Sequence, residues 1–234
     1  MKNHMPVPPP SDEPIEATRN RTGFYRGKEF RLRGKSHLVN LTNRAWLKWA
    51  SRKISFEEDA ILEVNASIWT EGQKQKSGYF TGYIVFASRD FLDSSNLHYI
   101  CDAESQTLAD FAEQFLIHEI DLSEFCDGGE LMFADLLEIR KEFQGQGLGV
   151  LAFSTILQEM RKAYDVSVCL FQPHPLQYTS STLAERANPK IRVAYHAAFN
   201  RLKTYYRNHL GATQFAAKSK YWYTRITDKK FPLG

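Results

Sequence analysis

The sequence predicts a mixed α/β (α+β) fold with a partly parallel sheet, and three segments in the middle of the chain lead to this prediction. Residues 131–139, LMFADLLEI, form an apolar run of strand type. A glycine-rich segment and an amphipathic helix at 148–163 follow, and then a second apolar strand at 165–171. A strand, a helix and a second strand in this order make a βαβ unit, in which the two strands lie parallel.

The other elements are predicted from hydrophobic periodicity. Residues 40–53, NLTNRAWLKWASRK, predict a first helix, because their apolar residues recur at helical spacing behind a cap at Thr42 or Asn43. Two strand-like runs at 60–69 and 79–88, joined by a polar segment, predict a hairpin. The remaining predicted elements are, in order, a helix at 105–120, a loop at 121–130, a helix at 190–208, and strands at 212–217 and 220–226.

The length of 234 residues suits one domain with an appendage. Residues 1–18 are rich in proline and acidic groups and predict a disordered tail. Residues 19–40 form a basic arm, and 41–234 are predicted to form a single domain. Within the arm, residues 19–35 carry seven basic side chains and one acidic one, interleaved with Phe24, Tyr25 and Phe30. Such a segment is either a solvated arm or a segment that binds the backbone of a nucleic acid.

Several classes of protein are disfavoured by what the sequence lacks. No apolar run approaches the ~20 residues of a membrane-spanning helix, and the first residues have no apolar segment of secretory type. We therefore predict a cytoplasmic protein without a membrane partner. The three cysteines, Cys101, Cys126 and Cys169, are far apart and form no zinc spacing, so we predict reduced thiols and no bound metal.

The segment QGQGLG at 144–149 is of the kind that holds phosphates at the start of a helix. It does not fit a Walker loop, which needs GxxxxGK followed by Ser or Thr. It does not fit a dinucleotide fingerprint either, because Val150 stands where the third glycine of GxGxxG would be. The pattern [Q/R]-x-x-G-x-[G/A] fits it and resembles the acetyl-coenzyme A loop of the GNAT N-acetyltransferase superfamily. The resemblance is strongest over residues 131–163.

This resemblance implies a GNAT-like central mixed sheet flanked by helices. Relative to that fold, the chain has an inserted helix near 105–119, just before the strand that would bind the cofactor. The implied function is transfer of an acetyl group from acetyl-CoA directly to an amine. Backbone groups of Ile139, Arg140 and Lys141 would pair with the pantetheine arm. The pyrophosphate would be held by Gln144, Gly145, Gln146, Gly147, Leu148 and Gly149.

The resemblance also suggests residues for proton transfer. Glu138 and Asp135 lie on the cofactor strand; three positions apart, they point to opposite faces of a regular strand, and Glu138 is the expected base. Tyr206, near the end of the last long helix, would protonate the departing thiolate, although it stands one residue further from Gly211 than in the family pattern. Asn200 lies where family members contact the cofactor.

The acceptor amine stays open at this point: it can be a small molecule, a protein amino group or a charged tRNA, and the chain can be a homodimer. Two other functions also remain. The chain can be a non-catalytic protein that binds CoA, which the irregular spacing of Tyr206 favours, or a nucleic-acid-binding module that uses the basic arm. His174, in the segment QPHP, is either a group of the acceptor site or a hydrogen-bonding residue of a loop.

Overall fold

The structure is a computed structural model that describes residues 22–25, 28–31, 36–54, 60–87, 93–174, 188–217 and 219–227. The predicted tail at 1–18 lies outside the described residues. Of the basic arm, the described part contains a two-stranded hairpin, formed by β1 (Thr22–Tyr25) and β2 (Lys28–Arg31), and the first residues of the main sheet, which begins at His37.

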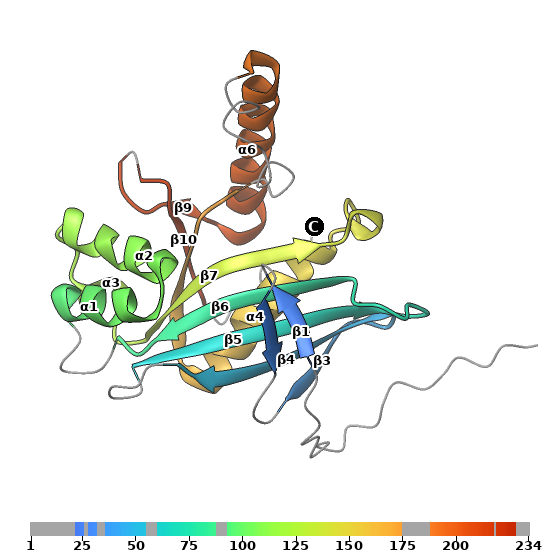
Figure 1. Cartoon of the computed structure of the whole chain (residues 1–234), viewed down its shortest axis with the longest axis horizontal. Coiled ribbons are helices and arrows are strands. Elements are labelled where there is room, and N and C mark those ends of the chain that lie inside the picture. Colours follow the sequence, from blue (N-terminus) through green and yellow to red (C-terminus); the bar gives the residue numbers. More distant parts are fainter. Residues whose placement is uncertain are drawn as a thin grey trace, which may run out of the picture.

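The main sheet of the described chain has eight strands in the order β3-β4-β5-β6-β7-β8-β10-β9 (Figure 1). Neighbouring strands run antiparallel except for β7 and β8, which pair in parallel. The strands are β3 (His37–Thr42), β4 (Ala45–Lys53), β5 (Ile61–Thr70), β6 (Gly78–Val85), β7 (Glu130–Ile139), β8 (Val166–Phe171), β9 (Thr213–Gln214) and β10 (Trp222–Arg225). The predicted mixed sheet, with one βαβ unit at its centre, is confirmed.

The helix predicted at 40–53 is wrong, because this segment forms the end of β3, a turn and β4. In β4 the side chains of Ala45, Leu47 and Trp49 are buried, while those of Trp46 and Lys48 between them are half-buried. This is the two-residue period of a strand with one face on the core. Trp46 and Ala50 add apolar positions that imitate helical spacing, but β4 pairs with β5 along its whole length, so the pairing decides the structure.

Three helices fill the insertion between β6 and β7: α1 (Ser94–Glu104), α2 (Gln106–Ile117) and α3 (Leu122–Cys126). They gather beside the end of the sheet where β7 begins (Figure 1). The helix predicted at 105–120 is confirmed as α2. The loop predicted at 121–130 is partly wrong, because it contains α3, where the side chain of Asp121 caps the helix by accepting a hydrogen bond from the Glu124 amide.

The two faces of the sheet carry separate clusters of buried side chains. On one face, α4 (Leu148–Tyr164) packs against β4 to β8 through residues such as Phe153 and Ile156. On the other face, the inserted helices pack against β7 and β8, chiefly through Phe111 and Phe115 of α2. The last long helix, α6 (Pro189–Leu210), projects away from the sheet (Figure 1), and only Ala198 and Leu210 of its side chains are buried. None of the described helices has the length and apolarity needed to cross a bilayer.

All three cysteines are buried and none forms a disulfide. Burial raises the pKa of both Cys101 and Cys126 to about 12 and raises the pKa of Cys169 as well. Because the thiolate is the reactive form, we expect the native protein not to react with Ellman's reagent at pH 8 on a time scale of minutes. In denaturant all three thiols should react, and fast labelling of the native chain would contradict the buried positions.

Candidate functional site

Strands β7 and β8 separate before β7 ends. They pair from Glu130 to Ala134 of β7, and the last paired residue of β8 is Phe171. Beyond Ala134, β7 continues to Ile139 and pairs with β6 alone. One edge of residues 135–139 therefore has no neighbouring strand in the described chain. An open strand edge presents backbone N–H and C=O groups that an extended ligand can pair with.

The backbone groups at the end of β7 are divided between the two sides of the strand. The amide of Arg140 donates to the Ser77 carbonyl at 2.9 Å, on the β6 side. On the other side, the carbonyl of Ile139 accepts a hydrogen bond of 2.7 Å from Nε2 of Gln144. Since neighbouring residues of a strand direct their backbone groups to opposite sides, Leu137 and Ile139 are the residues that face the open edge. Of the predicted backbone contacts at 139–141, the Ile139 amide is placed to meet a ligand there.

The glycine segment lies between a short 3₁₀ helix, η1 (Lys141–Phe143), and the start of α4. Gly145 and Gly147 have φ of 76° and 73°, in the left-handed region that glycine favours. A Cβ at either position would meet nothing within 4 Å, so both glycines are required by conformation and not by lack of space. Gly149 has ordinary φ, and Leu148 is buried and fixes the helix start onto the sheet.

The first turn of α4 offers backbone donors that the helix itself cannot satisfy. The first intrahelical bond runs from the Leu151 amide to the Gly147 carbonyl, so the amides of residues 148–150 precede it. Residues 144–147 are exposed, and the helix adds a partial positive charge at this end. The segment therefore has the geometry of an anion-binding site, with donors beside two backbone positions that only glycine adopts easily.

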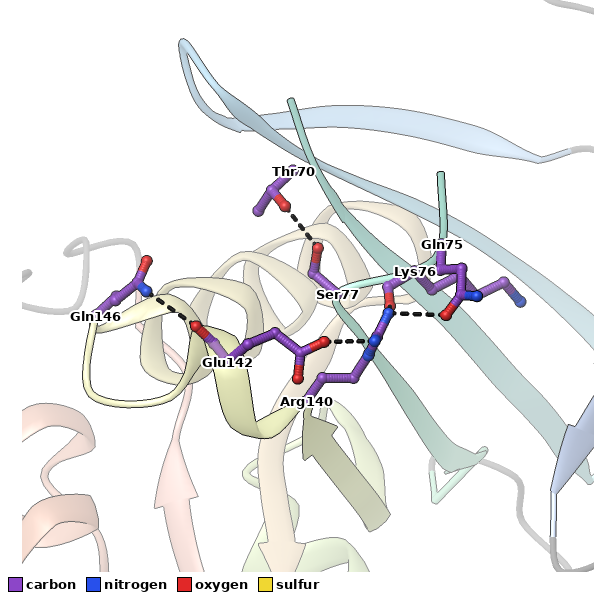
Figure 2. Close-up of polar contacts among 7 residues, drawn as sticks. All are labelled: Thr70, Gln75, Lys76, Ser77, Arg140, Glu142 and Gln146. Carbon is purple, nitrogen blue, oxygen red and sulfur yellow. Dashed lines mark hydrogen bonds and ion pairs between the residues drawn. The ribbon is translucent and has the colours of Figure 1, made fainter. Parts of the chain in front are cut away.

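Arg140 ties this segment to the hairpin between β5 and β6 (Figure 2). Its Nη1 donates to Oε1 of Gln75 at 3.1 Å and to the Lys76 carbonyl at 3.4 Å, and its Nη2 forms an ion pair with Glu142. Gln146 then donates from Nε2 to the carbonyl of Glu142 at 3.3 Å. The guanidinium of Arg140 is thus engaged within the chain, where it positions the glycine segment.

If this segment holds acetyl-CoA, as the resemblance implies, the variant Arg140→Met should bind it about three- to tenfold more weakly, because the loop loses its connection to the hairpin while the glycines are unchanged. The measurement is isothermal titration calorimetry. Arg52→Met is a matched control, since Arg52 is a partly exposed arginine near the other end of β4, away from the loop, where it forms an ion pair with Glu63. Equal loss of affinity in both variants would show that net charge, and not the position of the loop, is responsible.

A cleft of about 350 Å³ borders the same helix start on the side of the two hairpins. Phe143, Gln146, Leu148 and Leu151 line it from the loop and α4. Residues of the β3–β4 and β5–β6 turns, among them Arg44, complete its wall. The anion-binding geometry of the loop therefore adjoins a cavity with both polar and apolar walls.

Two tyrosines at the end of α6 occupy different surroundings. Tyr206 packs among Phe171 and Phe153, with ring centroids 4.9 and 6.3 Å away, and burial raises its pKa to about 12. Burial also raises the pKa of Tyr205, an effect partly offset by a hydrogen bond from the backbone of Val150 to its hydroxyl. The Tyr205 hydroxyl therefore lies near the first turn of α4, whereas the half-buried ring of Tyr206 packs against the apolar core.

Asn200 is not brought together with the loop. It is exposed on α6, and its side chain forms no hydrogen bond within the described chain. Six residues separate it from Tyr206, which places the two about 120° apart around the helix.

Glu138 and Asp135 lie on the same face of β7, so the expectation of opposite faces is wrong. Opposite Thr81 and Gly82, the pairing with β6 skips Asp135, which makes a β-bulge. Met132 and Ala134 before the bulge face α4, and so do Leu137 and Ile139 after it. The bulge has shifted the alternation by one residue, and Glu138 faces the side of the inserted helices.

Gly82 and Tyr79 of β6 support this arrangement. A Cβ at Gly82 would lie 2.8 Å from the carbonyl oxygen of Phe133, so glycine is needed where the strands meet at the bulge. The hydroxyl of Tyr79 donates to Oε2 of Glu138 at 2.6 Å and holds this carboxylate in place. This contact could not be predicted from the sequence, because residues 79 and 138 become neighbours only through the pairing of β6 with β7.

His174 follows β8, and its Nδ1 lies 3.4 Å from the hydroxyl of Tyr195 on α6. This contact agrees with the interpretation of His174 as a hydrogen-bonding loop residue. Within the described ranges, no three His, Cys, Asp or Glu side chains are grouped so that they could hold a metal ion.

Comparison with known proteins gives two solved structures of similar fold. One is arylalkylamine N-acetyltransferase 2 from Aedes aegypti, with 8% identity and a TM-score of 0.39 over 70% of this chain and 73% of that one. The other is an insect putative arylalkylamine N-acetyltransferase 7 from the yellow fever mosquito, with 10% identity and a TM-score of 0.35 over 70% of this chain and 64% of that one. No protein-family model and no curated protein matches the sequence.

Proposed function

We propose that the protein is an N-acyltransferase that transfers an acetyl group from acetyl-CoA directly to an amine. The observation that carries this proposal is the separation of β7 from β8 in front of a glycine segment that opens a helix. An extended thioester arm can pair with the backbone groups of an open strand edge, and a pyrophosphate can be bound by converging N–H donors at the start of a helix. A ligand that contains both parts needs the two features side by side.

In the proposed complex, the amides of residues 145–149 meet the pyrophosphate, and the open edge at Leu137 and Ile139 pairs with the pantetheine arm. A backbone amide at this edge is also placed to donate to the thioester carbonyl and to stabilise the negative charge that develops on its oxygen. The Ile139 carbonyl already accepts a hydrogen bond from the side chain of Gln144. When the pantetheine arm binds, this side chain either stays beside the arm or moves away from the carbonyl.

The reaction forms a C–N bond and breaks a C–S bond. We assign to Glu138, held by Tyr79, the removal of a proton from the acceptor ammonium, directly or through water, so that the free amine attacks the thioester carbon. The thiolate of CoA leaves and must gain a proton. Of the two tyrosines that follow Thr204, Tyr205 has its hydroxyl at the start of α4, and we assign the donation to it in preference to the predicted Tyr206.

Binding and turnover are tested in sequence. Acetyl-CoA at 1 mM should raise the melting temperature of the full chain, because a ligand that binds only the native state stabilises it. A panel of primary amines should then cause release of free CoA thiol, detected with Ellman's reagent. The absence of any thermal shift would refute the assignment of the glycine segment. A shift without thiol release from any amine would favour a protein that binds CoA without catalysis.

A further inference from the structure

The last long helix, α6, carries positive charge along its whole length. It contains five basic side chains and no acidic one. The five are Lys190, Arg192, Arg201, Lys203 and Arg207. The helix that carries them projects away from the sheet (Figure 1), and it is far in sequence from the basic arm at 19–40. The chain therefore has a second concentration of positive charge, on an element that stands out from the body of the protein.

The stability of the helix does not explain these charges. Within the part of the chain that the structure describes, none of the five forms an ion pair with a carboxylate. Lys190 and Arg192 lie in the first turn, where the partial positive charge of the helix repels cations. Lys203 and Arg207 contact the body of the protein over the ring of Trp222, at 5.8 and 5.4 Å. The other three are exposed, so their charges are available to a partner.

The exposed face of α6 has cations along both of its borders. Because each residue turns the helix by about 100°, Lys190 and Arg201 lie in one row, about 20° apart. Arg192 and Arg207 lie in a second row, roughly 140° from the first around the exposed side. The exposed side chains between the two rows are small or uncharged, and they are Val193, Ala197, Asn200 and Thr204. We call this surface the basic face of α6.

The composition of the basic face selects among anionic partners. The core of an interface with another protein is poor in charges and rich in aromatic side chains, and a helix on a membrane surface inserts large apolar side chains. The basic face offers neither, since its one exposed large hydrophobic residue is Val193. A second copy of the helix would be repelled by its like charge. Interfaces with nucleic acids are polar and strongly positive, as this face is.

We propose that α6 binds double-stranded DNA by lying in its major groove, with one row of cations against the phosphates of each strand. An α-helix with its side chains is about 10–12 Å wide, and the major groove of DNA, about 12 Å wide, admits one. The major groove of double-stranded RNA is too deep and narrow. The small side chains between the rows allow close approach to the bases. This inference goes beyond the proposed function and does not depend on it.

The test is fluorescence anisotropy of a labelled DNA duplex of about two helical turns, titrated with the full chain without acetyl-CoA at several salt concentrations. The double variant Arg192→Gln, Arg201→Gln removes one cation from each row, and glutamine keeps the helix propensity. We expect its affinity to fall about tenfold, and the slope of log affinity against log salt concentration to become shallower by roughly two. Ala197→Phe keeps the charge but obstructs the middle of the face, and it should also weaken binding about tenfold.

The matched control is the double variant Lys28→Gln, Arg31→Gln, which removes the same charge from β2 of the basic arm. It should keep its affinity for DNA within a factor of about three. An equal loss in this control would overturn the inference, because net charge or the arm would then be responsible. Unchanged affinity in Ala197→Phe would overturn the placement in the groove.

The choice of partner is tested with an RNA duplex of the same sequence and with vesicles that contain phosphatidylserine. If either binds as tightly as the DNA duplex, or if the native chain does not bind DNA at low salt, the inference is refuted. The thermal shift with acetyl-CoA should be the same in all variants. Failure of DNA binding and failure of the proposed function are therefore separate results.

Discussion

The double variant Gly145→Ala, Gly147→Ala is expected to bind acetyl-CoA about a hundredfold more weakly or worse. Both residues have positive φ, where a side chain costs about 1–2 kcal/mol per residue. The loop relieves this strain by leaving the left-handed region, and its amides then no longer converge. Loss of two charge-assisted hydrogen bonds is enough for the expected effect. Calorimetry with acetyl-CoA measures the affinity, and thermal unfolding measures the stability.

The matched control is the double variant Gly72→Ala, Gly128→Ala. These glycines have φ of 75° and 77°, and a Cβ at either would also meet nothing within 4 Å. Both double variants should therefore lose a similar free energy of unfolding, while the control keeps its affinity for acetyl-CoA. If the control loses the ligand as well, the effect comes from general destabilisation. If neither variant loses it, the loop amides do not hold the pyrophosphate.

The variant Tyr205→Phe is expected to lower kcat for acetyl transfer about a hundredfold, with little change in the affinity for acetyl-CoA. The phenol is the group whose hydroxyl lies at the first turn of α4, and phenylalanine keeps the ring but cannot donate a proton. Steady-state thiol release at saturating amine measures kcat, and calorimetry measures affinity.

Tyr206→Phe is the natural counterpart, because it removes a hydroxyl from the adjacent residue, whose half-buried ring packs against Phe171 of the core. We expect this variant to keep its kcat within a factor of about three. A large loss in Tyr206→Phe with none in Tyr205→Phe would return the role to the residue predicted from the sequence. Unchanged kcat in both would place the proton donor outside this pair, for example in a water molecule.

The centre of the fold could be predicted from the sequence because its signals are local. Residues 131–171 contain a buried strand, two glycines that need positive φ and an apolar helix face, and each is visible within a few residues. The segment 40–53 resembles a helix in sequence, because the positions of its tryptophans fit both the helical period and the two-residue period of a strand. The pairing with β5 decides between helix and strand, and β5 lies outside this segment.

The parts of the site that could not be predicted depend on contacts between distant residues. Whether Tyr205 or Tyr206 meets the glycine segment depends on how α6 is rotated against α4, and spacing to Gly211 does not determine this rotation. The hydrogen bond from Arg140 to Gln75 joins two residues that approach each other only because β6 and β7 pair. The bulge at Asp135 left no local sign either, since Gly82 on the neighbouring strand is the residue that accommodates it.

The bulge has one more consequence, which concerns insertions and deletions. Because it adds one residue to β7 relative to β6, removing Asp135 alone would restore the regular pleat without disturbing the pairing on either side. The side chains after residue 135 would keep their faces. Leu137 and Ile139 would remain on the α4 side, and Glu138 would stay opposite Tyr79. The shortened strand would then carry Ala134 and Leu136 as direct neighbours on alternate faces, and the sheet face that carries the inserted helices would lose one carboxylate with Glu138 unmoved. A one-residue deletion would thus change the charge on this face of β7 while leaving the glycine segment intact.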